Sequence, residues 1–136
     1  MKKLFSILFV ASLLVMLCSC GSSKLADGFN QNEVTAKAHE IITLINDGNY
    51  QSVTDQTRSD LQDDLSASVL QNAFSALLQS AGGFKEFSKT TVLGQQDSST
   101  KEDYAVVIVV AQYENKKMTY TISLDTKLEI VGLYLK

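Results

Sequence analysis

The stretch YAVVIVVAQY, residues 104–113, decides the fold. It is rich in β-branched residues, and a period of two distributes its apolar side chains over both faces of a strand. One face has Val106, Ile108 and Val110, and the other has Val107, Val109 and Ala111. A strand that is apolar on both faces is typical of the middle of a covered sheet. We therefore expect a central strand here, with Ile108 fully buried.

The sequence on both sides of this stretch predicts further strands. Residues 84–97 form one strand or a pair of strand pieces, and Gly94 is a candidate position for a bulge. Residues 118–124 alternate apolar side chains with Thr and Ser, which predicts a strand with one buried and one solvated face. Residues 128–136 form the last strand. Because short polar turns separate consecutive strands, we expect an antiparallel meander.

Helices precede the strands. Residues 33–46 and 66–81 repeat apolar side chains with a helical period, and residues 49–55 form a shorter helix. The first apolar stripe contains Val34, Ala38, Ile41, Ile42 and Ile45. The second contains Val69, Leu70, Ala73, Phe74, Leu77 and Leu78. Helices followed by an antiparallel meander predict an α+β domain, with the N-terminal helices packed on one face of the sheet.

The N-terminus has the pattern of a signal peptide. A basic start at Lys2 and Lys3 precedes residues 4–17, which are apolar apart from two serines. As a helix, this run spans about 21 Å, which is shorter than the ~30 Å hydrocarbon core of a bilayer. This length fits the apolar region of a secretory signal better than a membrane-spanning helix.

The run ends in Leu17-Cys18-Ser19-Cys20, which resembles the lipobox of bacterial lipoproteins. That resemblance implies cleavage after Ser19 and lipidation of Cys20. Lipidation of Cys18 instead would place the bulky Leu17 at the cleavage position, and a plain secretory signal is the other alternative. We expect a signal peptide at 1–19, a lipidated Cys20 with a flexible tether at 20–32, and one α+β domain at 33–136. The protein would then be extracytoplasmic and lipid-anchored to the bacterial membrane.

Composition excludes several function classes. The chain of 136 residues has 12 basic and 15 acidic residues, and this acidic balance argues against nucleic-acid binding. Its two cysteines cannot form a four-ligand zinc site or a disulfide framework. Cleavage and lipidation would leave no thiol for nucleophilic or redox chemistry.

Four short segments carry a resemblance to known domains. The segment INDGNY at 45–50 resembles the helix-end turn of the nuclear transport factor 2-like superfamily. Gly-Gly-Phe at 82–84, YAVVI at 104–108 and IVGLY at 130–134 resemble one bacterial member, the domain of unknown function 3887 family. The resemblance implies a cone-shaped fold with helices on a curved sheet. It implies no activity, because the wider superfamily contains both enzymes and binding domains.

No catalytic or metal-binding constellation is recognisable. His39 is the only histidine, and no cysteine or second histidine is available to form a metal site with it, so we expect a half-exposed surface residue. The acidic residues Asp60, Asp63 and Asp64 have no glycine for a calcium loop. Ser80 is not part of a nucleophile elbow. We therefore predict no catalytic residue, no metal and no cofactor.

A pocket, if the domain has one, is expected between the helix at 69–78 and the inner face of the sheet. Its expected lining is apolar apart from one tyrosine: Phe74, Leu77, Leu78, Ile108, Met118, Tyr120 and Ile122. Such a lining favours a small apolar ligand with one or two hydrogen-bonding groups. The alternative is that these side chains fill the core. An isomerase-like site would pair Tyr120 with a carboxylate, but residues 118–124 contain no acidic residue.

These observations favour a lipid-anchored extracytoplasmic binding domain without catalysis. Its partner would be a small apolar ligand in the cavity or another envelope protein on the exposed sheet face. The alternatives are a small pocket enzyme of the isomerase or hydrolase type and a structural envelope lipoprotein that forms a homodimer.

Overall fold

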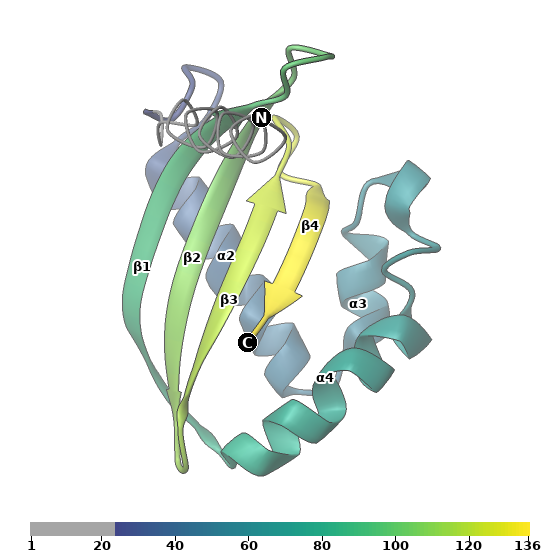
Figure 1. Ribbon diagram of the computed structural model, residues 1–136, viewed down its shortest axis with the longest axis vertical. Helices are drawn as coiled ribbons and strands as arrows, with labels where there is room; N and C mark the ends of the chain where they lie inside the picture. Colours follow the sequence, from purple (N-terminus) through teal and green to yellow (C-terminus); the bar gives the residue numbers. More distant parts are fainter. Residues whose placement is uncertain (1–23) are drawn as a thin grey trace, which may run out of the picture.

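The computed structural model describes residues 24–136, in which helices precede strands (Figure 1). The helices are α2 (Gln31–Asn46), α3 (Tyr50–Asp55), the 3-10 turn η1 (Ser59–Leu61) and α4 (Ala67–Ala81). The strands are β1 (Phe84–Gln96), β2 (Asp103–Tyr113), β3 (Lys117–Leu124) and β4 (Ile130–Leu135). This order confirms the predicted α+β class.

The four strands form an antiparallel meander in the order β1-β2-β3-β4. The sheet is curved, and Figure 1 shows α2 crossing behind it, while none of the helices within residues 24–136 lies on its front face. This arrangement is consistent with the cone that the family resemblance implies. The bulge expected at Gly94 is absent, because Gly94 pairs with Ala105 in regular register. The irregularities in β1 lie earlier, between Phe84 and Lys89.

The core lies between α2 and the inner face of the sheet. All five residues of the predicted α2 stripe are buried, and so are the alternating inner residues of β2 and β3. The stripe of α4 is only partly correct, because Leu70 and Phe74 are buried whereas Val69 is 45% exposed. The isolated bridge between Thr57 and Ile130 ties the segment after α3 to the start of β4.

Local side-chain caps determine where the two long helices begin. The Asn30 side chain accepts hydrogen bonds from the backbone N–H groups of Asn32 and Glu33, so α2 begins two residues earlier than predicted. Ser66 caps α4 by accepting a hydrogen bond from the backbone N–H of Val69. Gly48, with φ of 74°, follows α2 in the left-handed region that glycine favours.

Residues 24–29, which we call the N-terminal strap, pack against the domain. Leu25 and Phe29 are partly buried against the core. The backbone of Lys24 occupies the space that a side chain at Gly94 would need, and Gly28 lies against Thr126. The expectation of a flexible tether over residues 20–32 is therefore wrong for the strap, because its two apolar side chains bury themselves at the end of the sheet.

The predicted signal peptide and Cys20, the predicted lipidation site, lie outside the described residues. Within residues 24–136, no helix combines the length and the hydropathy needed to cross a membrane. In the same part of the chain, no group of three or more His, Cys, Asp or Glu residues could hold a metal ion.

Candidate functional site

Most of the residues predicted to line a pocket belong to the core or pack against it. Met118, Tyr120 and Ile122 are at most 2% exposed and belong to the core, together with Phe74. Leu77 and Leu78 are partly buried against that core.

Ile108 lies on the opposite face of the sheet from these residues and is only partly buried. The expectation that it is fully buried and lines the pocket is wrong. The physical reason is that the helices cover only one face of β2, and Val107 and Val109 occupy that face.

Two buried tyrosines and one asparagine form a hydrogen-bond chain inside the cone. The Tyr113 hydroxyl donates to Oδ1 of Asn46 at 2.6 Å, and it lies 2.6 Å from the Tyr120 hydroxyl. Because the single Tyr113 proton is used on Asn46, the Tyr120 hydroxyl is the donor to Tyr113. Burial raises the pKa of both tyrosines, so both hydroxyls stay neutral near pH 7. This hydrogen-bond chain therefore links α2 to β2 and β3, and neither of its tyrosines can act as a base near pH 7.

Replacing Tyr120 by phenylalanine is expected to reduce the free energy of unfolding by about 0.5–1.5 kcal/mol, because the buried Tyr113 oxygen loses one hydrogen-bond partner. Chemical denaturation measures this loss. The control is Tyr134→Phe, since Tyr134 is 60% exposed and should change stability very little. Equal effects of the two variants would contradict the buried chain.

A shallow cleft of about 520 Å³ opens beside Tyr113, where α4 turns into β1. Its lining comes from the end of α2, the end of α4 with the following turn, the start of β1 and the end of β2: Thr43, Asn46, Asp47, Leu78, Gly82, Gly83, Phe84 and Tyr113. Leu78 alone was among the predicted pocket residues. The lining offers an amide, hydroxyls and one carboxylate, with no histidine or thiol to activate a nucleophile.

His39 is used for packing. Its ring stacks on Phe87 of β1, with centroids 3.9 Å apart and planes 6° from parallel. Its Nε2 lies 2.9 Å from the hydroxyl of Thr90. Burial lowers the pKa of His39, so the ring is neutral near pH 7. The residue joins α2 to β1 and is partly exposed to solvent.

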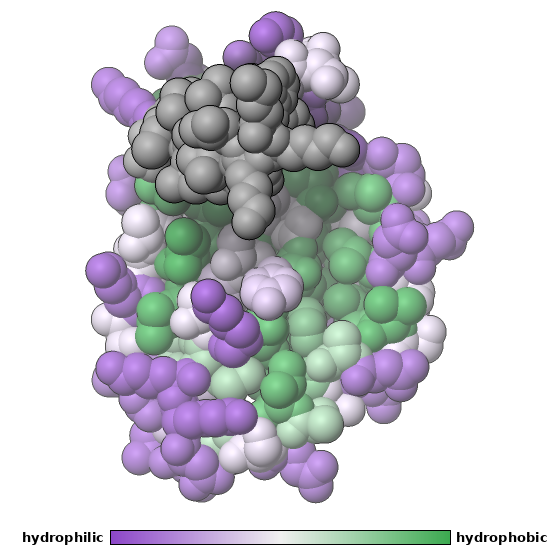
Figure 2. Space-filling view, viewed as in Figure 1, coloured by the Kyte–Doolittle hydropathy of each residue, from purple (hydrophilic) through white to green (hydrophobic). Residues whose placement is uncertain are grey.

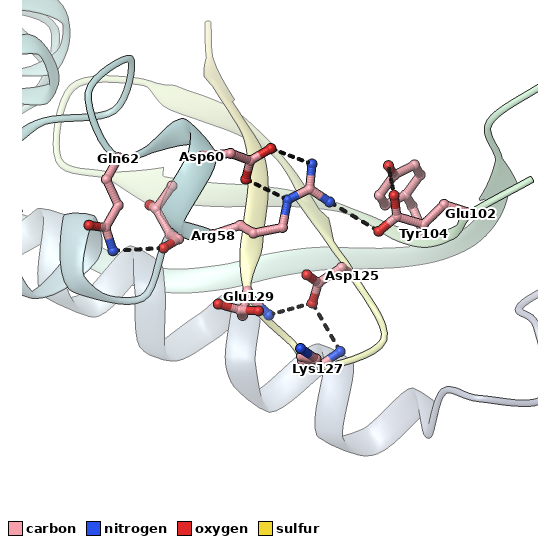
Figure 3. Close-up of polar contacts among 9 residues, drawn as sticks. Arg58, Asp60, Gln62, Glu102, Tyr104, Asp125, Lys127 and Glu129 are labelled. Carbon is pink, nitrogen blue, oxygen red and sulfur yellow. Dashed lines mark hydrogen bonds and ion pairs between the residues drawn. The ribbon is translucent and has the colours of Figure 1, made fainter. Parts of the chain in front are cut away.

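A polar cluster ties the η1 segment to the β1–β2 turn (Figure 3). Arg58 donates to both carboxylate oxygens of Asp60, at 2.7 and 3.1 Å, and to Glu102 at 3.0 Å. The Tyr104 hydroxyl donates to the other oxygen of Glu102 at 2.7 Å. The hydrogen bond to Asp60 raises the pKa of Arg58, and the same contact lowers the pKa of Asp60. Because two carboxylates already hold Arg58, this cluster is not an anion-binding site.

The face of the sheet that points away from the helices carries both apolar and small polar side chains. We call it the open sheet face and define it by the outward side chains of the four strands. Its apolar members are Leu93, Val106, Ile108, Val110, Val131 and Tyr134, and its small polar members are Thr91, Thr119, Thr121 and Ser123. The pairing places Thr91, Ile108, Thr121 and Tyr134 in one row across the sheet.

Apolar side chains gather in the middle of this face, and polar ones surround them (Figure 2). An antiparallel sheet with one solvated face ordinarily alternates apolar inward residues with polar outward ones. β3 follows this rule, whereas β2 has valine and isoleucine on its outward side. A contiguous apolar patch on a sheet face is typical of an interaction surface.

A model of the family described as "Protein of unknown function (DUF3887)" matches residues 38–133. The chain belongs to the DUF3887 family. The match extends from the middle of α2 into β4, so it includes the cleft and the open sheet face apart from Tyr134. No curated protein matches the chain.

The DUF3887 domain is also similar to a solved structure, the NMR structure of a protein from Ruminococcus gnavus ATCC 29149. The two share 29% sequence identity with a TM-score of 0.72, over 82% of this chain and 96% of that one. The likeness covers nearly all of that protein and agrees with the architecture described above. Neither the family nor this solved relative carries a stated activity.

Sequence analysis of this DUF3887 domain missed the cleft and the tyrosine chain. Tyr113 and Asn46 are 67 residues apart, and no local pattern pairs them. The glycines at 82 and 83 were the available signal for the cleft, because they permit the tight turn between α4 and β1. The apolar character of β2 was the available signal for the open sheet face.

Proposed function

We propose that this DUF3887 domain is a lipid-anchored extracytoplasmic binding domain that acts without catalysis and binds another protein through the open sheet face. The observation that carries the proposal is the apolar outward side of β2, which none of the described helices covers. Burying apolar surface gains about 25 cal/mol per Å². A partner that covers Val106, Ile108 and Val110 would therefore gain binding free energy, because it buries apolar surface that the domain alone leaves partly exposed.

A protein partner suits this surface better than a small ligand. Small-molecule sites are concave and enclose most of the ligand, whereas the open sheet face is an extended surface. The small side chains Thr119, Thr121 and Ser123 let a partner approach the backbone closely beside the apolar row. The cleft near Tyr113 is concave but shallow, and its lining mixes polar and apolar groups, whereas the sequence predicted a lining that is apolar apart from one tyrosine.

The anchor is supported by the sequence alone. Leu17, Ser19 and Cys20 match the lipobox pattern after a basic start and an apolar run. Two acyl chains hold a protein stably at a membrane. A pocket enzyme remains the alternative with less support, because the cleft lining includes no histidine or thiol and its tyrosine is neutral and engaged with Asn46.

A photo-crosslinking residue at position 121 tests the proposed surface in the membranes of the producing cell. The matched control places the same residue at Gln71, which is exposed on α4. We expect one defined protein to crosslink from position 121 and none above background from position 71. Thr121→Lys should then weaken binding of that purified protein about tenfold or more, since a charge would be buried in the contact.

Three outcomes would contradict the proposal. Equal crosslinking from both positions would show that the open sheet face has no specific partner. Adducts with a second copy of the chain would favour the homodimer in place of a different protein. Unchanged binding of Thr121→Lys, with its fold confirmed by circular dichroism, would place the contact elsewhere.

A further inference from the structure

We infer that the domain stands on the membrane with one particular end toward the bilayer. This end, which we call the strap end, contains the N-terminal strap, the β1–β2 turn at 97–102 and the β3–β4 turn at 125–129. The cleft and the β2–β3 turn would then point away from the membrane. The inference rests on the lipid anchor of the proposed function and adds an orientation to it.

The strap is a fixed part of the fold from Lys24 onward. The backbone of Lys24 and Leu25 lies directly over Gly94 near the end of β1, at a distance that leaves no room for a Cβ. Leu25 and Phe29 pack on the core, and Gly28 lies against Thr126 in the β3–β4 turn. The strap therefore crosses the same end of the sheet at which both turns lie (Figure 1).

The chain between the anchor and the strap is short. Lys24 follows Cys20 by four positions, and this stretch spans at most about 14 Å. β1 runs from Gly94 back to Phe84 at the cleft, and ten residues of strand cover about 33 Å. The connection is thus shorter than the domain. An inverted orientation, with the cleft against the bilayer, would need a tether more than twice as long.

This orientation also specifies the chemistry of the partner. At the end of the open sheet face away from the strap, three lysines point outward: Lys89, Lys117 and Lys136. Among the described residues that pair across the sheet with these lysines, Glu86 is the one acidic side chain on this face. Two copies anchored in one bilayer are related by a twofold axis along the membrane normal. Packing their open sheet faces together would set the lysine rows against each other, and such like-charge contact opposes association.

A partner that fits the upright domain is therefore a different protein. It presents an apolar strip opposite the row of Ile108 and Thr121, and carboxylates opposite the lysines farther from the membrane.

Energy transfer to the membrane surface tests the orientation. The full-length lipidated protein is reconstituted in phosphatidylcholine vesicles that contain a rhodamine-labelled lipid as acceptor. A donor dye is attached at Ser99→Cys in the β1–β2 turn or, in the matched variant, at Lys116→Cys in the β2–β3 turn. Both positions are exposed in hairpin turns at opposite ends of the sheet. We expect clearly higher transfer from position 99 than from position 116.

Equal transfer, or higher transfer from position 116, in protein that floats with the vesicles would overturn the orientation alone. Failure of the unmodified protein to float would overturn the anchor, and this inference with it. A further variant carries an insertion of about twenty Gly and Ser residues between Ser23 and Lys24, which leaves the strap intact and lengthens the tether well beyond the domain. It should still float but lose most of the difference between the two positions. A difference that survives the insertion would show that the short connection does not set the orientation.

Discussion

Replacing Ile122 by alanine is expected to lower the free energy of unfolding by about 2–5 kcal/mol, the range for removing a large side chain from a closed core. Ile122 is fully buried on the inner face of β3, where it pairs with Val107 of β2. Its removal leaves a cavity between the sheet and the helices, and the packed neighbours cannot fill it without strain. Urea denaturation followed by circular dichroism measures the change, provided that the slope of the transition stays the same.

The matched variant is Ile108→Ala, which deletes the same atoms from the other face of the sheet. Ile108 is only partly buried, so its loss should cost about 1 kcal/mol or less in the isolated domain. Equal losses for the two variants would contradict the assignment of inner and outer faces. A larger loss for Ile108 would show that the open sheet face is already covered in the purified protein.

The comparison of these two isoleucines shows what the sequence could and could not predict. In β3, the alternation of apolar and polar residues identified Ile122 as buried, because only one face of that strand is apolar. In β2, both faces are apolar, so periodicity could not say which one faces the helices. The interpretation that both faces are covered followed from that pattern, but the helices supply cover for only one.

The helices were predicted well where one stripe of side chains meets the sheet. The α2 stripe from Val34 to Ile45 is buried as expected because this helix lies along the core. In α4, Val69 is exposed because the helix contacts the core mainly through Leu70 and Phe74. A helical period identifies the apolar side of a helix but not the width of the surface that covers it.

Contacts between distant segments were beyond the reach of sequence patterns. The strap reads as a polar linker, and its packing depends on the absence of a side chain at Gly94, about seventy residues later. The cleft combines the ends of two helices with one turn and the ends of two strands. The tyrosine chain joins residues of α2, β2 and β3. Each of these features needs the curved sheet to be in place before its residues come together.

Replacing Cys20 by serine is expected to abolish acylation and to release the protein from the membrane fraction. Cys20 is the position that the lipobox pattern assigns to the lipid, with the small Ser19 before it at the cleavage position. Serine has no thiol to form the thioether that carries the diacylglycerol. Each buried methylene contributes about 0.8 kcal/mol to membrane binding, so the loss of both chains removes nearly all of the anchoring energy. Labelling cells with a fatty-acid analogue that can be detected in gels measures acylation directly.

Cys18→Ser is the matched variant, and it should retain both labelling and membrane localisation. Lipidation at Cys18 would require cleavage after Leu17, whose branched side chain does not fit the small pocket that the pattern implies. Loss of label in Cys18→Ser with retention in Cys20→Ser would move the anchor two residues toward the N-terminus. The connection to Lys24 would then grow from four to six positions, or about 20 Å, still shorter than the distance from Gly94 to the cleft. Persistence of label in both variants would reject the lipobox and, with it, the orientation that the short connection imposes on the domain.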